Sequence, residues 1–417
     1  MASARVSPRD IFSNRPLMIV ASGHLTVDMY SGMIPVLFPA LMREYDVSLG
    51  EVGLVALAYS GAASVSQPIF GWLADRFGTR YIGFTQIWCG VLFSTIGFAP
   101  SFAILVLLAG LAGLGSGMFH PMGAMNASAV TRAGQENMSM SVYVSAGTIG
   151  FAVGPLAGAA ITALFGLHGT LVMLVPGVLI GGWLLTAMRD VAVGGRPRAT
   201  SAQRAVGAAL PLGLIAIVVG VMMLRQIPVT GIESFIPAWY EDLGYQASFY
   251  STLATVMVLA SAAGALGVGG FADRYGRRTV MLVTMTLTIP VVWAFITFPG
   301  PWAFLFGPMI GFLASSTGPL LLVMAQQLMV GKAGMASGLI LGLGFVSGAI
   351  ATPILGAIAD ATSMTTALTW LLVVVAASVA VAWFLPSERT VRAISDEAIA
   401  RRDVGAARTT IDTAERA

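Results

Sequence analysis

The sequence predicts an all-α membrane protein with twelve transmembrane helices. Of its 417 residues, 57% are hydrophobic and 10% are charged, and the mean hydropathy is +0.85, which lies far outside the range of soluble globular domains. Turn residues divide the chain into about twelve apolar pieces, each long enough to cross a hydrocarbon layer of about 30 Å as a helix. Segments such as 103–110 are continuously apolar, which excludes the alternating pattern of a barrel strand.

The apolar segments define the expected spans. In the first half of the chain we place them near 16–42, 50–73, 80–98, 101–130, 135–163 and 167–188. In the second half we place them near 209–240, 247–271, 278–297, 300–328, 332–359 and 363–385. The first segment follows a short arginine-containing tail without a small-residue cleavage site, so we expect it to be retained as a helix.

Basic residues indicate the orientation. If both termini are cytoplasmic, all 22 lysines and arginines except Arg43 and Arg225 lie on the cytoplasmic side, as the positive-inside rule requires. We therefore expect a multi-pass membrane protein with both termini in the cytoplasm. The tail 1–15 is expected to be cytoplasmic, and the linker 189–208 and the tail 386–417 are expected to be cytoplasmic segments without fixed structure. The net charge of +3 then reflects loop placement rather than nucleic-acid binding.

An internal repeat relates the two halves. The block GWLADRFGTR at 71–80 recurs as GGFADRYGRR at 269–278. Four pairs of residues share one offset of 198 positions without an insertion, and they are Asp75 and Asp273, Pro155 and Pro353, Pro39 and Pro237, and Pro121 and Pro319. Chance is a poor explanation for this regularity, so we infer that a unit of six helices was duplicated.

The repeated G-x-x-x-D-R-x-G-x-R block resembles the signature of the major facilitator superfamily, and the resemblance covers essentially residues 16–385. It implies two six-helix bundles, at 16–188 and 209–385, with a substrate cavity between them. It also implies a monomeric transporter rather than an enzyme, located in the inner membrane of a prokaryote. Its expected partners are a small-molecule substrate, protons and the lipid bilayer, and its energy source is the proton gradient rather than a cofactor.

Two motifs supply candidate gating residues. By resemblance, the signature block holds the cytoplasmic side shut in the outward-open state. Its aspartate can lie at a helix N-terminus and its arginines can pair with nearby carboxylates; the alternative is a solvated turn. A glycine-proline stretch in the fifth span permits close helix packing and resembles the motif of members that export by antiport. The expected gating residues are Gly71, Asp75, Arg76, Arg80, Asp273, Arg274, Gly154 and Pro155.

Ionisable residues in the spans indicate a proton site. His24 and Asp28 lie one turn apart on one face of the first helix, and an ionised carboxylate facing lipid costs at least a few kcal/mol. By resemblance, helices one, four, seven and ten line the cavity, and they also carry His120 and Glu233. We expect Asp28 to be the main protonation site, His24 and His120 to tune it, and Glu233 to be a gate or a second proton carrier. The alternatives are an Asp28–Arg225 ion pair or a structural His24–Asp28 hydrogen bond.

Arg225 is the only basic residue expected within the hydrocarbon region. A guanidinium can hold a carboxylate, phosphate or phosphonate through two parallel hydrogen bonds, which favours an anionic or zwitterionic substrate. Neutralisation by Asp28 or Glu233 is the alternative. Further substrate contacts, or hydrogen bonds that only join helices, are expected from Gln226, Asn126 and Gln326.

The segments GHLTVD at 23–28 and GLGSGMFHP at 113–121 resemble the fosmidomycin-resistance type of exporter within this superfamily. The expected function is therefore proton-coupled efflux of a drug or metabolite, as in antibiotic resistance. One alternative is an uptake symporter for a small organic anion. Another is a divalent-metal transporter that uses His24, Asp28 and His120 as ligands. A sensor or enzyme that has lost transport is disfavoured, because no nucleophile elbow or phosphate loop is present.

Overall fold

The structure, a computed structural model, describes residues 11–47, 49–191 and 210–414, and within these ranges it contains helices and no strand. Among the described residues, eleven helical segments are long and apolar enough to cross a membrane, with Leu167–Ala187 and Ala303–Leu328 each counted as one segment, and a shorter apolar segment covers Ile82–Phe98. The all-α fold with twelve spans that the sequence predicts is therefore confirmed. The predicted linker 189–208 lies largely outside the described residues.

The helices of the first half follow the predicted spans closely. The main differences are at two 3-10 segments, because the third span ends as η1 and the sixth begins as η2. The elements are α2 (Arg15–Tyr45), α3 (Leu49–Phe77), α4 (Ile82–Ser94), η1 (Ile96–Phe98), α5 (Phe102–Ala129), α6 (Glu136–Phe165), η2 (Leu167–Met173) and α7 (Leu174–Ala187).

The helices of the second half repeat this order. The expected tenth span is divided at Ser316 into two consecutive helices, which the apolar pattern alone did not reveal. The elements are α9 (Leu212–Asp242), α10 (Ala247–Tyr275), α11 (Arg277–Thr297), α12 (Ala303–Ser315), α13 (Thr317–Leu328), α14 (Ala333–Ala361), α15 (Met364–Ala382) and α16 (Glu388–Ala414).

The repeated signature block forms the same turn twice. Gly78 and Gly276, one repeat apart, have φ angles of 85° and 86°, a region that glycine enters without a Cβ penalty. Each glycine ends the long helix before it, and its N–H donates to the carbonyl of Ala74 or Ala272. The turn glycine of the signature is therefore required by backbone geometry.

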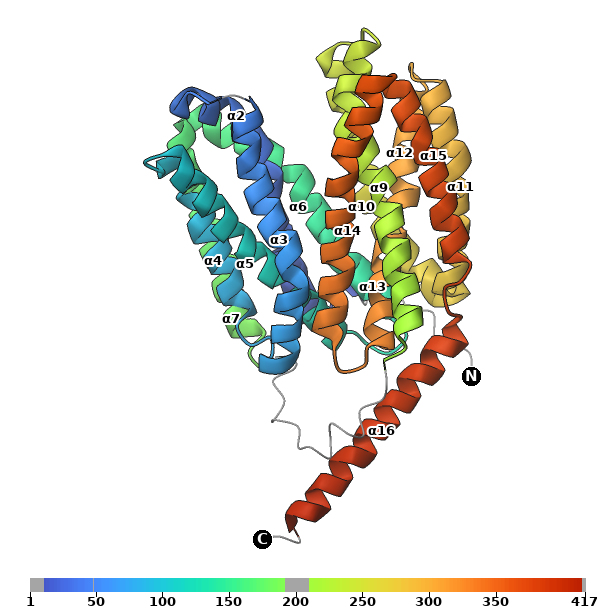
Figure 1. The fold of residues 1–417 in the computed structure, drawn as a ribbon. Helices are drawn as coiled ribbons and strands as arrows, with labels where there is room; N and C mark the ends of the chain where they lie inside the picture. Colours follow the sequence, from blue (N-terminus) through green and yellow to red (C-terminus); the bar gives the residue numbers. More distant parts are fainter. Residues whose placement is uncertain (1–10, 48, 192–209, 415–417) are drawn as a thin grey trace.

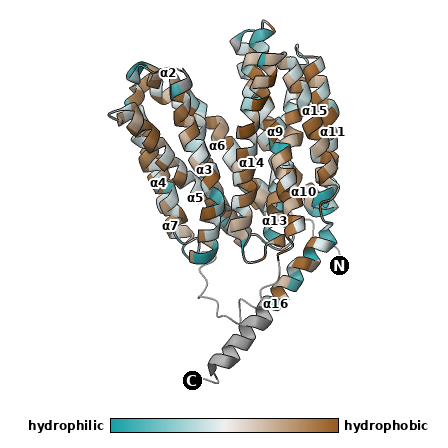
Figure 2. Cartoon of the chain, viewed as in Figure 1, coloured by the Kyte–Doolittle hydropathy of each residue, from teal (hydrophilic) through white to brown (hydrophobic). Residues whose placement is uncertain are grey.

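The two bundles approach each other at one end and diverge at the other (Figure 1). The first bundle contains α2 to α7 and the second α9 to α15, and α3 packs against α14 while α6 packs against α10. Helix α16 extends beyond the end at which the bundles meet (Figure 1). Apolar residues dominate the middle of both bundles, and hydrophilic residues collect at the helix ends and on α16 (Figure 2).

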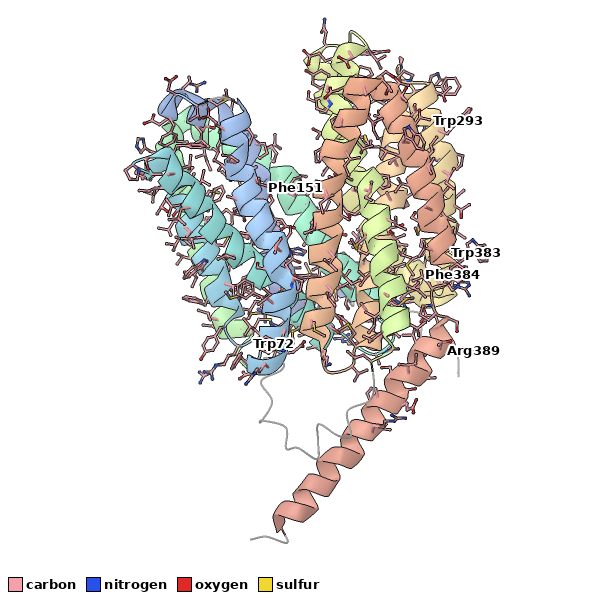
Figure 3. All side chains as sticks on the ribbon, in the orientation of Figure 1. Trp72, Phe151, Trp293, Trp383, Phe384 and Arg389 are labelled. Carbon is pink, nitrogen blue, oxygen red and sulfur yellow. The ribbon has the colours of Figure 1, made fainter. Side chains whose placement is uncertain are left out.

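Large aromatic side chains point outward from the bundles. Trp293, Trp383 and Phe384 project from the outer surface of the second bundle, and Trp72 projects near the end at which the bundles meet (Figure 3). Phe384 is 71% exposed and Trp383 is 62% exposed. Such exposure would be unfavourable in water, and in a membrane protein it places these rings against lipid or the headgroup region.

Glycines set the closest contacts in the molecule. A Cβ at Gly150 would collide with the carbonyl oxygen of Leu25, and one at Gly154 would lie 2.5 Å from that of Met29. Helices α6 and α2 therefore pack backbone against backbone, as small-residue interfaces in membranes allow. A Cβ at Gly71 would likewise collide with the carbonyl oxygen of Gly334, so the two bundles also pack backbone against backbone at this point.

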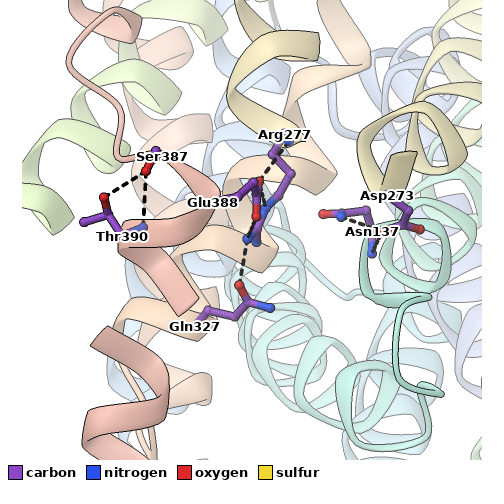
Figure 4. Close-up of polar contacts among 7 residues, drawn as sticks. All are labelled: Asn137, Asp273, Arg277, Gln327, Ser387, Glu388 and Thr390. Carbon is purple, nitrogen blue, oxygen red and sulfur yellow. Dashed lines mark hydrogen bonds and ion pairs between the residues drawn. The ribbon is translucent and has the colours of Figure 1, made fainter. Parts of the chain in front are cut away.

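The C-terminal tail corrects one sequence-based expectation. Its described part forms the long helix α16 rather than a segment without fixed structure. The first residue of this helix is anchored to the second bundle, because the Glu388 carboxylate accepts hydrogen bonds from the backbone N–H and side chain of Arg277 at 2.6–2.9 Å. Arg277 also donates to Gln327 at 2.7 Å (Figure 4). Local composition did not reveal this contact because its partners lie in distant segments.

Candidate functional site

Three ionisable side chains meet in the first bundle. His24 Nε2 lies 3.3 Å from Asp28 Oδ2, and His120 Nε2 lies 3.1 Å from Asp28 Oδ1. The two histidine residues are 4% and 5% exposed, whereas the Asp28 side chain is 19% exposed. We call His24, Asp28 and His120 the triad. The predicted alternative of a His24–Asp28 contact is present, but it is one part of this larger arrangement.

The backbone fixes the tautomer of both imidazoles. Nδ1 of His24 lies 2.7 Å from the Tyr143 carbonyl oxygen, and Nδ1 of His120 lies 2.7 Å from that of Ser116. A carbonyl oxygen can only accept, so each Nδ1 must carry a hydrogen and donate it. In a neutral imidazole the other nitrogen, Nε2, then presents a lone pair. Both Nε2 atoms are therefore acceptors aimed at Asp28.

The triad consequently lacks hydrogen-bond donors when it is fully deprotonated. An ionised carboxylate is also an acceptor only, so each of the two contacts to Asp28 needs a proton. The proton can reside on the imidazole or, for one contact, on the carboxyl group. Without these protons, two nitrogen and two oxygen atoms that can only accept hydrogen bonds would face one another in a largely buried site, which is unfavourable. The arrangement is suited to binding and releasing protons.

The same atoms can hold a divalent cation. One ligand atom from each triad residue lies within 4.8 Å of the others, and metal-bound histidines commonly donate their second ring N–H to a backbone carbonyl. Two imidazole nitrogens and one carboxylate oxygen form a ligand set that zinc and similar ions accept. The geometry thus fits a proton or a cation between the same groups.

Two residues of α6 that sequence reasoning missed complete the site. The Tyr143 ring stacks on His24, with centroids 4.2 Å apart and planes 20° apart, and its hydroxyl donates to the His120 carbonyl at 3.1 Å. A Cβ at Gly147 would lie 2.5 Å from Asp28 Oδ2. No local sequence signal indicates Tyr143, because its role arises only when α6 packs on α2.

Arg225 lies in the second bundle and is not brought to Asp28. Its residue is 8% exposed, its Nη1 lies 3.3 Å from Met222 Sδ, and it lines a small cavity with Thr288 and Thr317. Among the described residues it forms no ion pair within 4 Å, with Asp28 or with Glu233. The alternative of an Asp28–Arg225 ion pair is therefore wrong for this conformation.

The other predicted substrate contacts have separate surroundings. Gln226 donates to Thr230 at 3.2 Å and is partly exposed, and Glu233 on the same helix is exposed. Asn126 is fully buried and accepts from Thr79 at 2.6 Å. The Gln326 amide donates to Ser337 at 2.9 Å and to the Ala124 carbonyl of the first bundle at 3.3 Å. In this structure the amides of Asn126 and Gln326 join helices rather than face the triad.

The predicted gating aspartates join the two bundles. Asp75 accepts from the backbone N–H groups of Gly334 and Met335 at 2.8 and 2.9 Å, at the start of α14. Asp273 accepts from the N–H groups of Asn137 and Met138 at 3.4 and 3.3 Å, at the start of α6. The Asn137 side chain adds a bond of 2.6 Å to Asp273 (Figure 4). Each carboxylate thus binds a positive helix N-terminus of the other bundle.

The signature arginines contact aromatic rings. The guanidinium carbons of Arg76, Arg80 and Arg274 lie 5.6, 4.8 and 5.0 Å from the ring centroids of Trp72, Tyr81 and Tyr275. Among the described residues these arginines form no ion pair with a carboxylate. The predicted carboxylate pairing is replaced by cation–π contact.

Comparison with known proteins agrees with this architecture. The family model of the Major Facilitator Superfamily matches residues 20–352 and 218–410. The chain belongs to the major facilitator superfamily. It is therefore a multi-pass membrane transporter rather than an enzyme, as the sequence predicted.

The chain is similar to curated proteins of two bacteria. It is 29% identical over 366 residues to the uncharacterized MFS-type transporter YfnC of Bacillus subtilis, covering 84% of this chain and 87% of that protein. It is 26% identical over 360 residues to the fosmidomycin resistance protein of Escherichia coli, covering 83% and 86%. The predicted likeness to the fosmidomycin-resistance type is confirmed.

Solved structures share the fold. The crystal structure of FucP in the outward conformation superposes with a TM-score of 0.72 at 13% identity, covering 89% of this chain and 98% of that chain. The human organic anion transporter MFSD10 superposes with a TM-score of 0.74 at 14% identity, covering 89% and 99%.

Proposed function

We propose that this superfamily member exports a small drug or metabolite in exchange for protons. The observation that carries the proposal is the triad, in which two histidine Nε2 atoms face one carboxylate and both contacts need a proton. The similarity to a fosmidomycin resistance protein supports efflux, and so does the glycine-proline stretch around Gly154 and Pro155. The protein is proposed to work as a monomer in a prokaryotic inner membrane.

The charge distribution supports an outward-open reading of this conformation. With both termini cytoplasmic, the end at which Asp75 and Asp273 join the bundles is the cytoplasmic end, and the divergent end faces outward. The partly exposed carboxylate of Asp28 would then load protons from outside. Release of both aspartates would let the bundles rock, and the triad would deprotonate toward the cytosol.

Coupling requires that protons and substrate favour different states or compete for one site. An anionic or zwitterionic substrate is proposed because Arg225 is a buried guanidinium without an ionic partner among the described residues. Gln226 and Glu233 lie on the same helix and are proposed to contribute to the substrate path or to a second proton site. Asn126 and Gln326 are proposed to contact substrate only after their inter-helix bonds break.

Proteoliposome flux with an imposed pH gradient tests the proposal. Wild-type protein should move fosmidomycin, a phosphonate chosen as probe, against its gradient when protons flow the other way. Asp28→Asn should abolish the dependence on the pH gradient. His168→Gln is the matched control, because His168 is an exposed histidine outside the triad. Flux of the probe that ignores the gradient and survives Asp28→Asn would remove the mechanism.

A second candidate function is divalent-metal transport, favoured by the convergence of three ligand atoms within 4.8 Å. Under that reading, zinc or cobalt uptake would saturate and would be lost in His24→Ala and in His120→Ala. Fosmidomycin flux would not respond to either substitution. The two functions thus give opposite results with the same two variants.

A further inference from the structure

A polar pocket lies where the two bundles and α16 meet. Its volume is about 840 Å³, which is within the range of small-molecule binding sites. One wall is formed by the loop before α6 and the first turn of that helix, including Glu136 and Asn137. The other walls are the turn between α10 and α11, the end of α13 and the first part of α16 (Figure 4). The pocket is therefore built from both halves of the chain.

Most of the negative charge in this pocket already has partners. Asp273 accepts hydrogen bonds from the side chain of Asn137 and from the backbone at the start of α6. Glu388 accepts from the backbone and the side chain of Arg277. Glu136 accepts from a backbone N–H of the preceding loop at 3.0 Å. A cation that entered the pocket would have to compete with these bonds, so the pocket is poorly suited to one.

The positive charge of the pocket is in excess by comparison. Arg389 and Arg392 line the pocket from α16 and are exposed, and among the described residues neither forms an ion pair within 4 Å. Of the lining carboxylates, that of Asp396 is left to balance these two guanidinium groups. The charge that remains available in the pocket therefore favours an anion.

Two buried atoms of the lining residues lack hydrogen-bond partners. Arg277 is 2% exposed and Asn137 is 7% exposed, and in the described part of the chain neither Arg277 Nη1 nor Asn137 Oδ1 has a partner. Leaving a buried polar atom unsatisfied costs about 1–3 kcal/mol. The first atom is a donor in the second bundle, and the second atom is an acceptor in the first bundle. A ligand with an anionic oxygen and a hydroxyl group would satisfy both.

We propose that this pocket binds a phosphate-bearing anion that also carries a hydroxyl group. Arg389 and Arg392 bind the phosphate oxygens together with Arg277, since guanidinium groups bind phosphate through charge-assisted hydrogen bonds of matching geometry. The hydroxyl group donates to Asn137. In the proposed orientation the pocket lies at the cytoplasmic end, where two sources offer this chemistry. One is a soluble phosphate ester, and the other is the headgroup of an anionic phospholipid.

The bound anion holds the gate at Asp273 closed. Asn137 donates to Asp273 across the two bundles at 2.6 Å, and both residues line the pocket. Opening of this gate would therefore separate one wall of the pocket from the others. A ligand that contacts both bundles binds the closed form more tightly and shifts the balance toward it. Neither the triad nor Arg225 lines this pocket, so the site is regulatory.

The test measures ligand-dependent gate closure in full-length protein in nanodiscs. Spin labels at Asp46 and Leu243, in a Cys89→Ser background, report the separation of the divergent ends of the bundles. Asp75→Asn is included because weakening the other gate populates the alternative conformation. The midpoint of thermal unfolding is recorded on the same samples, since a ligand that binds only the folded protein raises it.

Two arms of the experiment distinguish the sources of phosphate. In the first, glycerol 1-phosphate is added to phosphatidylcholine nanodiscs at constant ionic strength. In the second, phosphatidylglycerol replaces part of the phosphatidylcholine. At least one arm should raise the unfolding midpoint and shift the balance toward the long label separation by about tenfold, the scale of one charge-assisted hydrogen bond. The arm that responds identifies the source.

Matched arginine variants assign the response to the pocket. Combined Arg389→Gln and Arg392→Gln should abolish both responses, and the protein should fold because both side chains are exposed. Arg401→Gln is the control, because Arg401 is also an exposed arginine of α16 but pairs with Glu397. It should respond as the protein without this substitution does.

Two results would overturn the inference. One is an unfolding midpoint and a label separation that change in neither arm. The other is an equal response with and without Arg389→Gln and Arg392→Gln, which would place the effect outside the pocket. A midpoint shift without a change in label separation would overturn the link to the gate. These measurements require no transport, so their outcome is independent of the proposed exchange of substrate for protons.

Discussion

The two bundles share a scaffold but differ in the chemistry at its centre. The residues of the second bundle that correspond in the repeat to the triad, Tyr143 and Gly147 cannot form such a site. The corresponding pairs are His24 with Met222, Asp28 with Gln226, His120 with Gly318, Tyr143 with Leu341, and Gly147 with Phe345. The gating aspartates, in contrast, correspond to each other and make the same kind of contact. The contacts of the gating aspartates are therefore common to both halves of the repeat, whereas the residues of the triad occur in the first half alone.

The second bundle places a permanent cation near the equivalent position. Arg225 Nη1 lies 3.3 Å from Met222 Sδ and would lie 3.3 Å from a Cβ at Gly318, and these residues are the counterparts of the two triad histidines. A guanidinium keeps its charge at any physiological pH, whereas imidazoles and carboxyls exchange protons. The first bundle thus contains side chains whose charge can change with pH, and the second bundle contains Arg225, whose charge does not.

The largest expected effect is at the centre of the first bundle. Asp28→Asn removes the carboxylate to which both Nε2 atoms point, so it should reduce proton-driven exchange by about two orders of magnitude or more. Gln226→Asn, the counterpart substitution in the second bundle, should change exchange far less. Proteoliposome exchange of both variants side by side measures the asymmetry. Equal losses would show that the two bundles contribute alike.

A smaller effect on transport is expected from substitution of Arg225, the permanent cation of the second bundle. Arg225→Gln should raise the KM for an anionic substrate by about ten- to a hundredfold, the scale of one charged hydrogen-bonding pair. The KM for a neutral substrate should stay unchanged. Thermal stability should hold or increase, because an unpaired buried charge is removed. A variant that loses stability and keeps its KM would assign Arg225 a structural role instead.

Substitution of either gating aspartate should change the conformational balance to the same extent. Asp75→Asn and Asp273→Asn each weaken charge-assisted bonds to a helix N-terminus, and each should shift the balance between conformations by about tenfold. Spin labels at Asp46 and Leu243, at the divergent ends of α2 and α9, measure the change in a Cys89→Ser background. The label separation should shorten in both variants. A response in only one would break the symmetry inferred from the repeat.

The smallest expected effect concerns the contact between Arg277 and Glu388. This contact is specific to the second bundle, because the residue of the first bundle that corresponds to Arg277 in the repeat is Thr79. Burial alone would raise the pKa of Glu388, but the hydrogen bonds and charge of Arg277 outweigh it and hold that pKa below its ordinary value. The contact therefore contributes stability above the ordinary pKa of a free glutamate, near 4.3. This contribution is lost as pH falls through the lower folded-state value.

Glu388→Gln should lower stability at pH 7 by about 1 kcal/mol and by less at pH 3. Thermal unfolding of the detergent-solubilised protein at the two pH values measures this difference. Glu397→Gln on the exposed part of α16 is the control and should change little, since Glu397 and Arg401 form an exposed pair. An equal loss at both pH values would contradict an ionic anchor.

The sequence predicted the fold well and the site in part. Apolar length and the repeat at an offset of 198 residues were sufficient for the spans, because each span must satisfy its backbone within lipid. His24, Asp28 and His120 could be named because ionisable residues are rare at that depth. Tyr143, Gly147 and Glu388 could not, since their roles depend on which helices pack together and at what distance.

The most direct test of the central claim is proton release on substrate binding. Fosmidomycin is added to purified protein in weakly buffered detergent solution, and a pH-indicator dye reports released protons. The account predicts release by wild-type protein, strongest near the pH midpoint of exchange, and none by Asp28→Asn despite retained binding of the substrate. Equal proton release by both proteins would contradict the claim that the triad is the site where protons are exchanged.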